Sequence, residues 1–342
     1  MKVLLVKMSS MGDVIHTLYA VQDAAERLPE LRFDWVVEEG FAELPALHPA
    51  VNTVIPIAIR RWRGQPVAAW RSGEIGRFRE ALGARDYDCV LDAQGLLKSA
   101  AVALGARGPR IGLDRHSARE SLASLAYGTQ VHVPRGHAVA RLRELFAAAF
   151  GYEMPEAPPA AGLDVKPEGQ GRSVVFVHGT TWTSKEYPIQ HWRTLCECAT
   201  EDGMAVVLPA GNARELERAE AIGADCGAEV LFRPGLSELA ARMAGAAGVI
   251  TVDSGLGHLA DALGKPMVAV FGSTSPSLTG PCGTRSKVIV STTLPCVPCL
   301  QRKCRFAPGE YAKIHPPCYD GVAPTAVWTA LRARMDAPAL PS

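Results

Sequence analysis

Residues 249–259 join an apolar, β-branched run to a polar break that leads into a helical pattern. The break consists of Asp253, Ser254 and Gly255, and His258 follows one turn later. Free backbone N–H groups at a helix start bind anions, and a glycine lets the backbone approach a ligand closely. We therefore expect Asp253, Ser254, Gly255 and His258 to surround a bound anion.

Two further loops in the second half carry groups suited to a nucleotide. After the apolar run 174–177 come Thr180, Thr181 and Lys185, whose hydroxyls and ammonium suit phosphate oxygens. An ordinary surface loop with an incidental lysine accounts for the same residues. After the run 206–208, Glu215 stands near a helix start. Stabilisation by the helix dipole explains this carboxylate without a ligand, and ribose hydroxyls are the functional alternative.

The first apolar run of the chain, residues 3–6, also leads into a glycine-containing helix start. Ser10 and Gly12 precede Asp13, which opens the helical pattern. An aspartate at this position caps a helix well, and a carboxylate at a strand end can also take a proton from a hydroxyl. The residue types leave both interpretations open.

The composition is that of an ordinary globular protein. The chain has 342 residues, 48% of them hydrophobic and 21% charged, with a net charge of +1 and nine cysteines. We expect neither nucleic-acid binding, nor a transmembrane segment, nor a cleaved signal peptide. The cysteines then belong to a reducing compartment, and the expected location is the cytoplasm.

Short β-type runs alternate with longer amphipathic stretches in both halves of the chain. This alternation predicts an α/β protein made of two Rossmann-like, doubly wound domains with a ligand cleft between them. The expected domains are residues 1–155 and 172–320, followed by a closing helix and tail at 321–342; residues 152–171, rich in Pro, Ala and Gly, are the expected linker.

One segment of the first half is strongly basic. Six arginines lie between Arg60 and Arg79, together with Trp62, Trp70 and Phe78. A solvated helix face explains such a segment, and so does a docking surface for an acidic acceptor or anionic lipid headgroups.

Four cysteines near the end of the chain have the spacing of metal ligands. Cys296, Cys299, Cys304 and Cys318 form a C-x₂-C-x₄-C-x₁₃-C pattern. A structural zinc or iron ion is one interpretation, and free buried thiols or disulfides are the others, with disulfides disfavoured in a reducing compartment.

Six segments together resemble the lipopolysaccharide heptosyltransferases of glycosyltransferase family 9. They are KMSSMGDVIHTL at 7–18, FDWVVEEGF at 33–41, IAIRRWR at 57–63, DAQG at 92–95, SARE at 117–120 and VDSGLGH at 252–258. The resemblance runs from residue 1 to about residue 280. It implies the GT-B fold and an inverting transferase that moves L-glycero-D-manno-heptose from ADP-heptose to Kdo of Kdo2-lipid A, at the inner face of the cytoplasmic membrane and without a required cofactor.

The resemblance also assigns roles to individual residues. Asp13 matches the general base of the family. Lys185 matches a residue that binds the sugar donor and acts on its departing diphosphate. The remaining donor-side matches are Thr180, Thr181, Glu215, Asp253, Ser254, Gly255 and His258. On the acceptor side the matches are Ser10, Gly12, Arg60, Arg61, Arg63, Gln94, Lys98 and Arg119. The resemblance to the family members that add the first heptose does not imply the cysteine cluster.

Other functions remain as alternatives. A sibling heptosyltransferase would use another lipopolysaccharide acceptor, and a non-catalytic protein would bind a nucleotide sugar or a metal. A dinucleotide oxidoreductase is disfavoured, because no G-x-G-x-x-G follows the first apolar run.

Overall fold

The computed structural model describes residues 1–169, 171–291, 294–310 and 312–337. The chain divides into two compact units, Met1–Asp164 and Val165–Ser342. The division falls inside the expected linker. No helix of the described residues is both long and apolar enough to cross a membrane.

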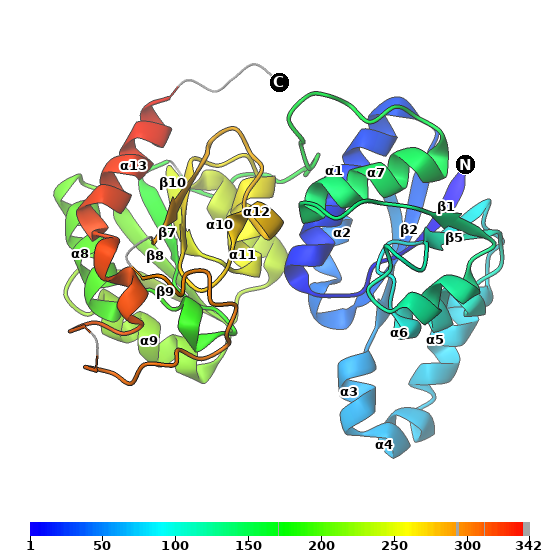
Figure 1. Cartoon of the computed structure of the whole chain (residues 1–342), viewed down its shortest axis with the longest axis horizontal. Coiled ribbons are helices and arrows are strands. Elements are labelled where there is room, and N and C mark those ends of the chain that lie inside the picture. Colours follow the sequence, from blue (N-terminus) through cyan, green and yellow to red (C-terminus); the bar gives the residue numbers. More distant parts are fainter. Residues whose placement is uncertain (170, 292–293, 311, 338–342) are drawn as a thin grey trace. The chain divides into compact units, whose positions relative to one another are not determined.

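The first unit is built on a sheet of parallel strands in the order β3-β2-β1-β4-β5-β6 (Figure 1). Its central strands are buried almost throughout, as expected for a parallel sheet that is covered on both faces. The strands are β1 (Lys2–Val6), β2 (Arg32–Glu38), β3 (Val51–Ile57), β4 (Cys89–Asp92), β5 (Arg110–Leu113) and β6 (Thr129–Val131).

Helices cover both faces of this sheet. Helices α1 (Met11–Arg27) and α7 (Ala138–Phe150) pack together, and Phe33 of β2 contacts the rings of Phe146 and Phe150 on α7. Leu4 and Val36 point to the other face, against α5 (Glu74–Gly83) and α6 (Leu97–Gly105). The shorter helices are η1 (Glu39–Phe41), α2 (Glu43–Ala46), α3 (Ile59–Gly64), α4 (Pro66–Arg71) and η2 (Ser121–Ala126).

The second unit repeats the architecture with the strand order β12-β11-β10-β7-β8-β9. Its strands are β7 (Ser173–Val177), β8 (Ala205–Ala210), β9 (Glu229–Phe232), β10 (Gly248–Val252), β11 (Met267–Phe271) and β12 (Ser286–Val290). Its helices are η3 (Thr183–Lys185), α8 (Ile189–Glu201), α9 (Ala213–Gly223), α10 (Leu236–Gly245), α11 (Gly255–Ala262), α12 (Pro276–Thr279), η4 (Pro317–Gly321) and α13 (Pro324–Asp336).

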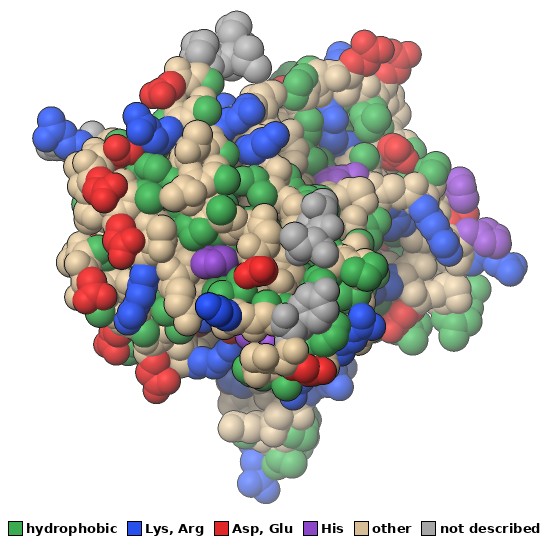
Figure 2. Space-filling model, turned by 60° about the vertical axis from the view of Figure 1, so that its left-hand side comes forward, with side chains coloured by type: hydrophobic (Ala, Val, Ile, Leu, Met, Phe, Trp, Pro, Cys, Tyr) green, Lys and Arg blue, Asp and Glu red, His purple; other side chains and the backbone are tan. Residues whose placement is uncertain are grey.

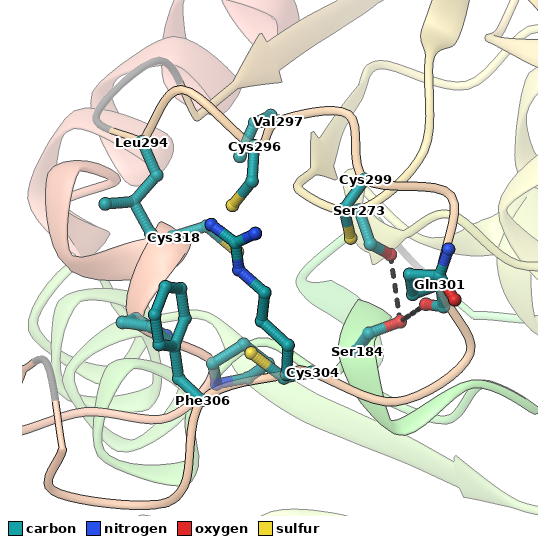
Figure 3. A pocket seen from close by; sticks show the side chains of 13 residues that line it. Ser184, Ser273, Leu294, Cys296, Val297, Cys299, Gln301, Cys304, Phe306 and Cys318 are labelled. Carbon is teal, nitrogen blue, oxygen red and sulfur yellow. Dashed lines mark hydrogen bonds between the residues drawn. The ribbon is translucent and has the colours of Figure 1, made fainter.

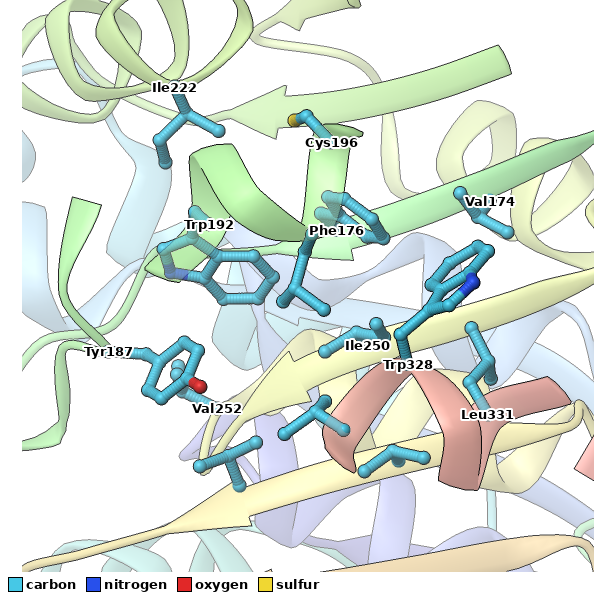
Figure 4. Close-up of a cluster of buried hydrophobic side chains, with 14 of the residues drawn as sticks. Val174, Phe176, Tyr187, Trp192, Cys196, Ile222, Ile250, Val252, Trp328 and Leu331 are labelled. Atoms are coloured by element: carbon cyan, nitrogen blue, oxygen red, sulfur yellow. The ribbon is translucent and has the colours of Figure 1, made fainter. Parts of the chain in front are cut away.

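A large apolar core joins the C-terminal helix to this second sheet (Figure 4). Trp192 of α8 packs on Phe176 of β7, while Trp328 and Leu331 of α13 are buried in the same cluster. The indole N–H of Trp328 also donates to Asp202 at 2.8 Å. Helix α13 therefore packs as an integral part of the second unit.

Both sheets have the strand order that creates a ligand crevice. In each, the first strand lies between the second and the fourth, so the chain winds in opposite directions on its two sides. Ligands of doubly wound sheets bind at the carboxyl ends of the strands at this point. We therefore expect binding and catalytic residues in the loops that follow β1 and β4 in the first unit, and in those that follow β7 and β10 in the second.

Candidate active site

Asp13 lies in the first turn of α1, immediately after the loop that leaves β1. Its Oδ2 accepts hydrogen bonds from the backbone N–H of Ser10 at 2.8 Å and from the Ser10 hydroxyl at 2.7 Å. Its Oδ1 has no hydrogen-bond partner among the described residues. One oxygen thus caps the helix while the other remains available to accept a proton, so the two sequence-based interpretations are compatible.

A polar cavity of about 170 Å³ in the first unit includes Asp13. Three cationic side chains, Lys7, Arg119 and Arg141, also line it. Burial lowers the pKa of Lys7, although Asp13 and Asp92 nearby favour its charged form. Lys7 Nζ donates to the carbonyl of Ala93 at 2.9 Å. This cavity combines a carboxylate with a cationic lining, which suits an anionic molecule that carries a reactive hydroxyl.

The loop after β4 is tied to the loop after β1. Gln94 Oε1 accepts from the backbone N–H of Met8 at 2.7 Å, and Lys98 Nζ donates to Ser9 Oγ at 3.3 Å. The backbone N–H groups of Gln94 and Gly95 donate to the buried carboxylate of Asp92. Two expected acceptor residues, Gln94 and Lys98, therefore lie beside the loop that carries Ser10 and Gly12.

The three arginines of α3, Arg60, Arg61 and Arg63, are not among the described residues that line the Asp13 cavity. Arg61 instead makes a bidentate pair with Glu39, at 2.9 and 3.0 Å, and a second pair with Glu74 at 2.8 Å. Hydrogen bonds from Arg61 to these two carboxylates raise its pKa. Arg60 lies over the ring of Phe41, and Arg63 is exposed. Arg61 is thus neutralised within the protein, whereas Arg63 is not paired among the described residues.

Helices α3 and α4 project from the body of the first unit (Figure 1) and end in a cationic tip (Figure 2). We name residues 59–83 the basic arm. Trp70 is 75% exposed and Val67 is 60% exposed on it. Trp62 instead packs against Phe78 and donates to Glu74 at 2.9 Å, which holds the base of the arm. The arm therefore presents both apolar and cationic groups to solvent.

In the second unit, Asp253 organises the carboxyl end of β10. Its Oδ2 forms a 2.7 Å ion pair with Lys185 Nζ and accepts from the Thr274 hydroxyl, also at 2.7 Å. His258 Nε2 lies 3.9 Å from the other carboxylate oxygen. The Asp253 side chain is only 7% exposed, so the Lys185 ammonium compensates a buried charge.

The loop after β7 brings the expected phosphate ligands to the same place. The Thr180 hydroxyl donates to the carbonyl of Asp253 at 3.3 Å, and the Lys185 ammonium lies 4.5 Å from the centre of the Trp182 ring. Thr181 is exposed. Lys185 is thereby fixed on two sides, by a carboxylate and by an indole face.

Helix α11 starts directly behind this loop. Ser254 is its N-cap and accepts from the backbone N–H of Gly257 at 3.2 Å. Gly255 is the first residue of the helix. A Cβ at Gly257 would lie 2.6 Å from Thr251 Oγ1, so only glycine lets the helix start this close to β10. Asp253, Ser254, Gly255 and His258 are thus grouped as the sequence predicts.

Glu215 of α9 lies at the neighbouring carboxyl end of β8. Its Oε2 accepts from the backbone N–H of Gly211 at 2.8 Å, and Asn212 caps the helix. A Cβ at Gly179 would lie 2.9 Å from Glu215 Cδ, so the glycine permits the loop after β7 to approach this carboxylate. Glu215 is therefore next to the loop that carries Thr180.

Sequence reasoning missed several residues of these two regions. Lys7 and Arg141 belong to the Asp13 cavity, and Trp182 and Thr274 contact the Lys185–Asp253 pair. Lys7 directly follows strand β1, and Trp182 lies in the loop that also contains Thr180 and Lys185, so both carried a local signal. Arg141 and Thr274 reach their places only through tertiary packing.

The four clustered cysteines line one cavity of about 40 Å³ in the second unit (Figure 3). All nine cysteines of the chain are free thiols. Burial, and then the nearby thiols of Cys304, Cys299 and Cys296, raise the pKa of Cys318 to about 12. Within the described ranges, however, no three His, Cys, Asp or Glu side chains are arranged so that they could hold a metal ion as they stand. The expected convergence of the thiols is observed, and the expected metal geometry is not.

Comparison with known proteins decides the family. The model of "Glycosyltransferase family 9 (heptosyltransferase)" matches residues 75–309. The chain belongs to glycosyltransferase family 9. It is 47% identical to lipopolysaccharide heptosyltransferase 1 of Pseudomonas aeruginosa over 99% of both chains. The solved structure of the Escherichia coli heptosyltransferase WaaC with ADP is similar, with a TM-score of 0.82 and 44% identity over 85% of this chain and 93% of that one.

A second WaaC structure, with ADP-2-deoxy-2-fluoro heptose, has a TM-score of 0.78 and 44% identity and covers 84% of this chain and 93% of that one. Together with the two six-stranded parallel sheets, these similarities confirm the expected GT-B fold with two Rossmann-like domains. They also confirm that the family 9 chain is a heptosyltransferase of lipopolysaccharide inner-core synthesis. The oxidoreductase and non-catalytic alternatives are therefore excluded.

Proposed function

We propose that this protein transfers L-glycero-D-manno-heptose from ADP-heptose to Kdo of Kdo2-lipid A with inversion at the anomeric carbon. The observation that carries the proposal is the chemical division between the units: one has a carboxylate in a cationic cavity, and the other has a lysine paired with Asp253, which immediately precedes the N-cap of α11. The relatives' names and the ADP and ADP-sugar complexes of the E. coli enzyme support the donor.

The second unit is proposed to bind the donor. Lys185, with the Thr180 and Thr181 hydroxyls and the backbone N–H groups at the start of α11, would hold the diphosphate. Glu215 would accept hydrogen bonds from ribose hydroxyls, which are uncharged donors. Asp253 and His258, already joined to the Lys185 site, would contact the heptose.

The first unit is proposed to bind the acceptor. Kdo carries a carboxylate and lipid A carries phosphates, so their binding site must supply positive charge. Lys7, Arg119 and Arg141 do so in the cavity that contains Asp13, which Gln94 also lines. The other proposed acceptor residues are Ser10 and Gly12, at the start of α1, and Lys98, in the first turn of α6. Arg60, Arg61 and Arg63 lie on the basic arm, where they would meet more distant phosphates.

The reaction would be a single displacement. The acceptor hydroxyl attacks the anomeric carbon, its proton passes to Asp13 Oδ1, and the bond from the anomeric carbon to the diphosphate oxygen breaks. ADP leaves with the electron pair of that bond, so negative charge grows on the diphosphate. Lys185 and the α11 N–H groups would stabilise this charge in place of a divalent metal. The residues thus require no catalytic cofactor.

A choice of acceptors tests the proposed function. The purified protein is incubated with ADP-heptose and either Kdo2-lipid A or its monoheptosylated product, and the lipids are analysed by mass spectrometry. We expect only Kdo2-lipid A to gain the mass of one heptose. Gain by the monoheptosylated product alone would establish the sibling acceptor instead, and gain by neither would refute both assignments.

Because the proposed acceptor is a membrane lipid, we also propose that the basic arm binds the inner face of the cytoplasmic membrane. Each exposed cation near an anionic surface contributes about 1 kcal/mol. We expect Arg63→Ala combined with Arg71→Ala to weaken binding to phosphatidylglycerol vesicles roughly 30-fold. Arg61→Ala should have a smaller effect, since Glu39 and Glu74 already neutralise this guanidinium.

Vesicle sedimentation measures this binding. The matched control combines Arg115→Ala with Arg135→Ala, which removes two exposed charges of the same unit outside the basic arm. Neutral phosphatidylcholine vesicles provide the second control. Equal losses in the two double variants would show that net charge, and not the arm, determines binding.

A structural zinc or iron ion at Cys296, Cys299, Cys304 and Cys318 belongs to the same proposal. The ion would stabilise the loop that contains these cysteines and take no part in heptose transfer.

A further inference from the structure

The loops at the proposed donor site carry little uncompensated positive charge. Lys185 is the only lysine or arginine in the segments that connect β7 to α8, β8 to α9, β10 to α11 and β11 to α12. Asp253 already pairs with its ammonium at 2.7 Å. The diphosphate of a sugar nucleotide carries two negative charges, and more charge develops as it leaves. The N–H groups at the start of α11 supply roughly half an elementary charge, so another cation at this edge of the sheet would improve the balance.

The connection after β12 brings such a cation to the same edge. Strand β12 is parallel to β11, so the chain leaves both strands at the carboxyl edge of the sheet. The backbone N–H of Leu300 donates to the carbonyl of Ser273 at 2.8 Å, which ties the connection to the loop after β11. Arg302 follows two residues after Leu300. Its backbone is therefore part of this edge.

The loop that carries Lys185 fixes the backbone of Arg302. The carbonyl of Arg302 accepts from the backbone N–H of Ser184 and from the Thr183 hydroxyl, both at 3.3 Å. The adjoining carbonyl of Gln301 accepts from the Ser184 hydroxyl at 2.5 Å (Figure 3). Thr183 and Ser184 are the two residues that directly precede Lys185. Arg302 and Lys185 thus start from neighbouring points of the backbone.

The side chains of Arg302 and Lys185 also contact the same ring. The Arg302 guanidinium carbon lies 5.8 Å from the centre of the Trp182 ring, and the Lys185 ammonium lies 4.5 Å from it. Both distances are in the range of cation–π attraction. Arg302 is exposed and, within the described part of the chain, pairs with no carboxylate, whereas Lys185 pairs with Asp253. Arg302 therefore presents an uncompensated positive charge beside the Lys185 site.

The chemistry of this side chain suits a phosphate. A guanidinium binds two phosphate oxygens with parallel N–H groups, and it keeps these groups available when it packs on an aromatic face. A lysine ammonium provides a point charge without this fork. The two cations on the Trp182 ring would thus contribute in different ways to one diphosphate.

We propose that Arg302 binds the diphosphate of the sugar nucleotide beside Lys185, and that Trp182 positions the Arg302 guanidinium. Arg302 would supply the net positive charge that Asp253 cancels at Lys185, and it would stabilise the departing ADP. Trp182 is a positioning residue, because it acts on the diphosphate through the two cations. This inference rests on the proposed donor role of the second unit, but it is tested by ADP binding without heptose transfer.

Affinity for ADP is the first measurement, made by titration calorimetry on the full-length protein. We expect Arg302→Met to raise the Kd for ADP roughly 10-fold, as for the loss of one charge-assisted hydrogen bond. Arg302→Lys should lose less, since it keeps the charge and loses only the fork. The matched control is Lys303→Met, which removes an exposed cation one residue further along and should leave the Kd unchanged.

The salt dependence of the Kd distinguishes a phosphate contact from a purely structural role. Salt screens the attraction between a cation and a phosphate, and it affects the order of a loop much less. We therefore expect the Kd to rise less steeply with sodium chloride in Arg302→Met than in the unmodified protein or in Lys303→Met. Weakened binding with the parental salt dependence would show that Arg302 only orders η3, and would overturn the proposal.

Two variants test the positioning role of Trp182. Trp182→Leu removes the aromatic face and should weaken ADP binding, whereas Trp182→Phe keeps such a face and should bind ADP more tightly than Trp182→Leu. Thermal unfolding checks that every variant is folded. Equal Kd values in Trp182→Leu and the unmodified protein would refute the positioning role.

The remaining outcomes separate this inference from the proposed function. Parental ADP affinity in Arg302→Met, or an equal loss in Lys303→Met, would refute the diphosphate contact. An unmodified protein that binds ADP through Arg302 but transfers no heptose would refute the proposed function and leave the contact established. An unmodified protein that does not bind ADP would refute both.

Discussion

Asp13→Asn is expected to lower kcat by a factor of about 10²–10⁴ while the protein remains folded. The asparagine oxygen can still accept a hydrogen bond from Ser10, which now bonds Asp13 Oδ2. The amide cannot take up a proton at the oxygen or nitrogen that replaces Oδ1. The change therefore removes the proposed base and preserves the hydrogen bonds with Ser10, so it separates the two roles proposed for this side chain.

Three measurements on this variant distinguish catalysis from folding. Thermal unfolding should shift little, because the asparagine oxygen still accepts from Ser10, the N-cap of α1, and the lost charge in the first turn contributes only about 0.3–1 kcal/mol. The Kd for ADP should stay unchanged, since the donor residues lie in the second unit. The third measurement is kcat itself, with Glu238→Gln as the matched control: that change removes a first-turn carboxylate from α10 and should leave kcat unaffected. An Asp13→Asn variant with the parental kcat would exclude Asp13 as the base.

The strand pattern was predictable from sequence because it depends on local hydrophobicity. Every apolar run that indicated a strand corresponds to one of β1–β12. Helix boundaries in the basic arm were less predictable. The amphipathic pattern of residues 71–82 predicts one helix, but α4 ends at Arg71 and α5 starts only at Glu74, because Gly73 has a left-handed backbone with φ of 70°. The charge pattern of the arm did not reveal this break.

The candidate site was predictable only in part, for a similar reason. Asp13, Thr180, Lys185 and Asp253 follow strands whose carboxyl ends lie at one edge of a sheet, so topology alone groups them in their units. Arg61 was expected to face an acceptor, yet it pairs with Glu39 and Glu74. Such partners depend on contacts between distant segments, which no local pattern encodes.

We propose both a structural and a catalytic role for the Lys185–Asp253 pair, and a set of variants separates the two roles. Lys185→Met should lower kcat/KM roughly 30-fold to 1,000-fold, the equivalent of losing about 2–4 kcal/mol of stabilisation of the developing diphosphate charge. The same change leaves a buried carboxylate without its cation, so the free energy of unfolding should fall by about 3 kcal/mol.

Adding Asp253→Asn to Lys185→Met removes the unpaired charge, and the Thr274 hydroxyl can still donate to the asparagine oxygen. Denaturant unfolding should show recovery of most of the lost stability, while kcat/KM stays low. The matched control is Arg143→Met, which breaks the buried pair with Asp23 in the first unit. It should cost comparable stability and leave kcat/KM of the folded protein close to the parental value. If the double variant regained activity together with stability, Lys185 would act only by neutralising Asp253, and the stabilisation of the leaving ADP would have to come from the α11 N–H groups.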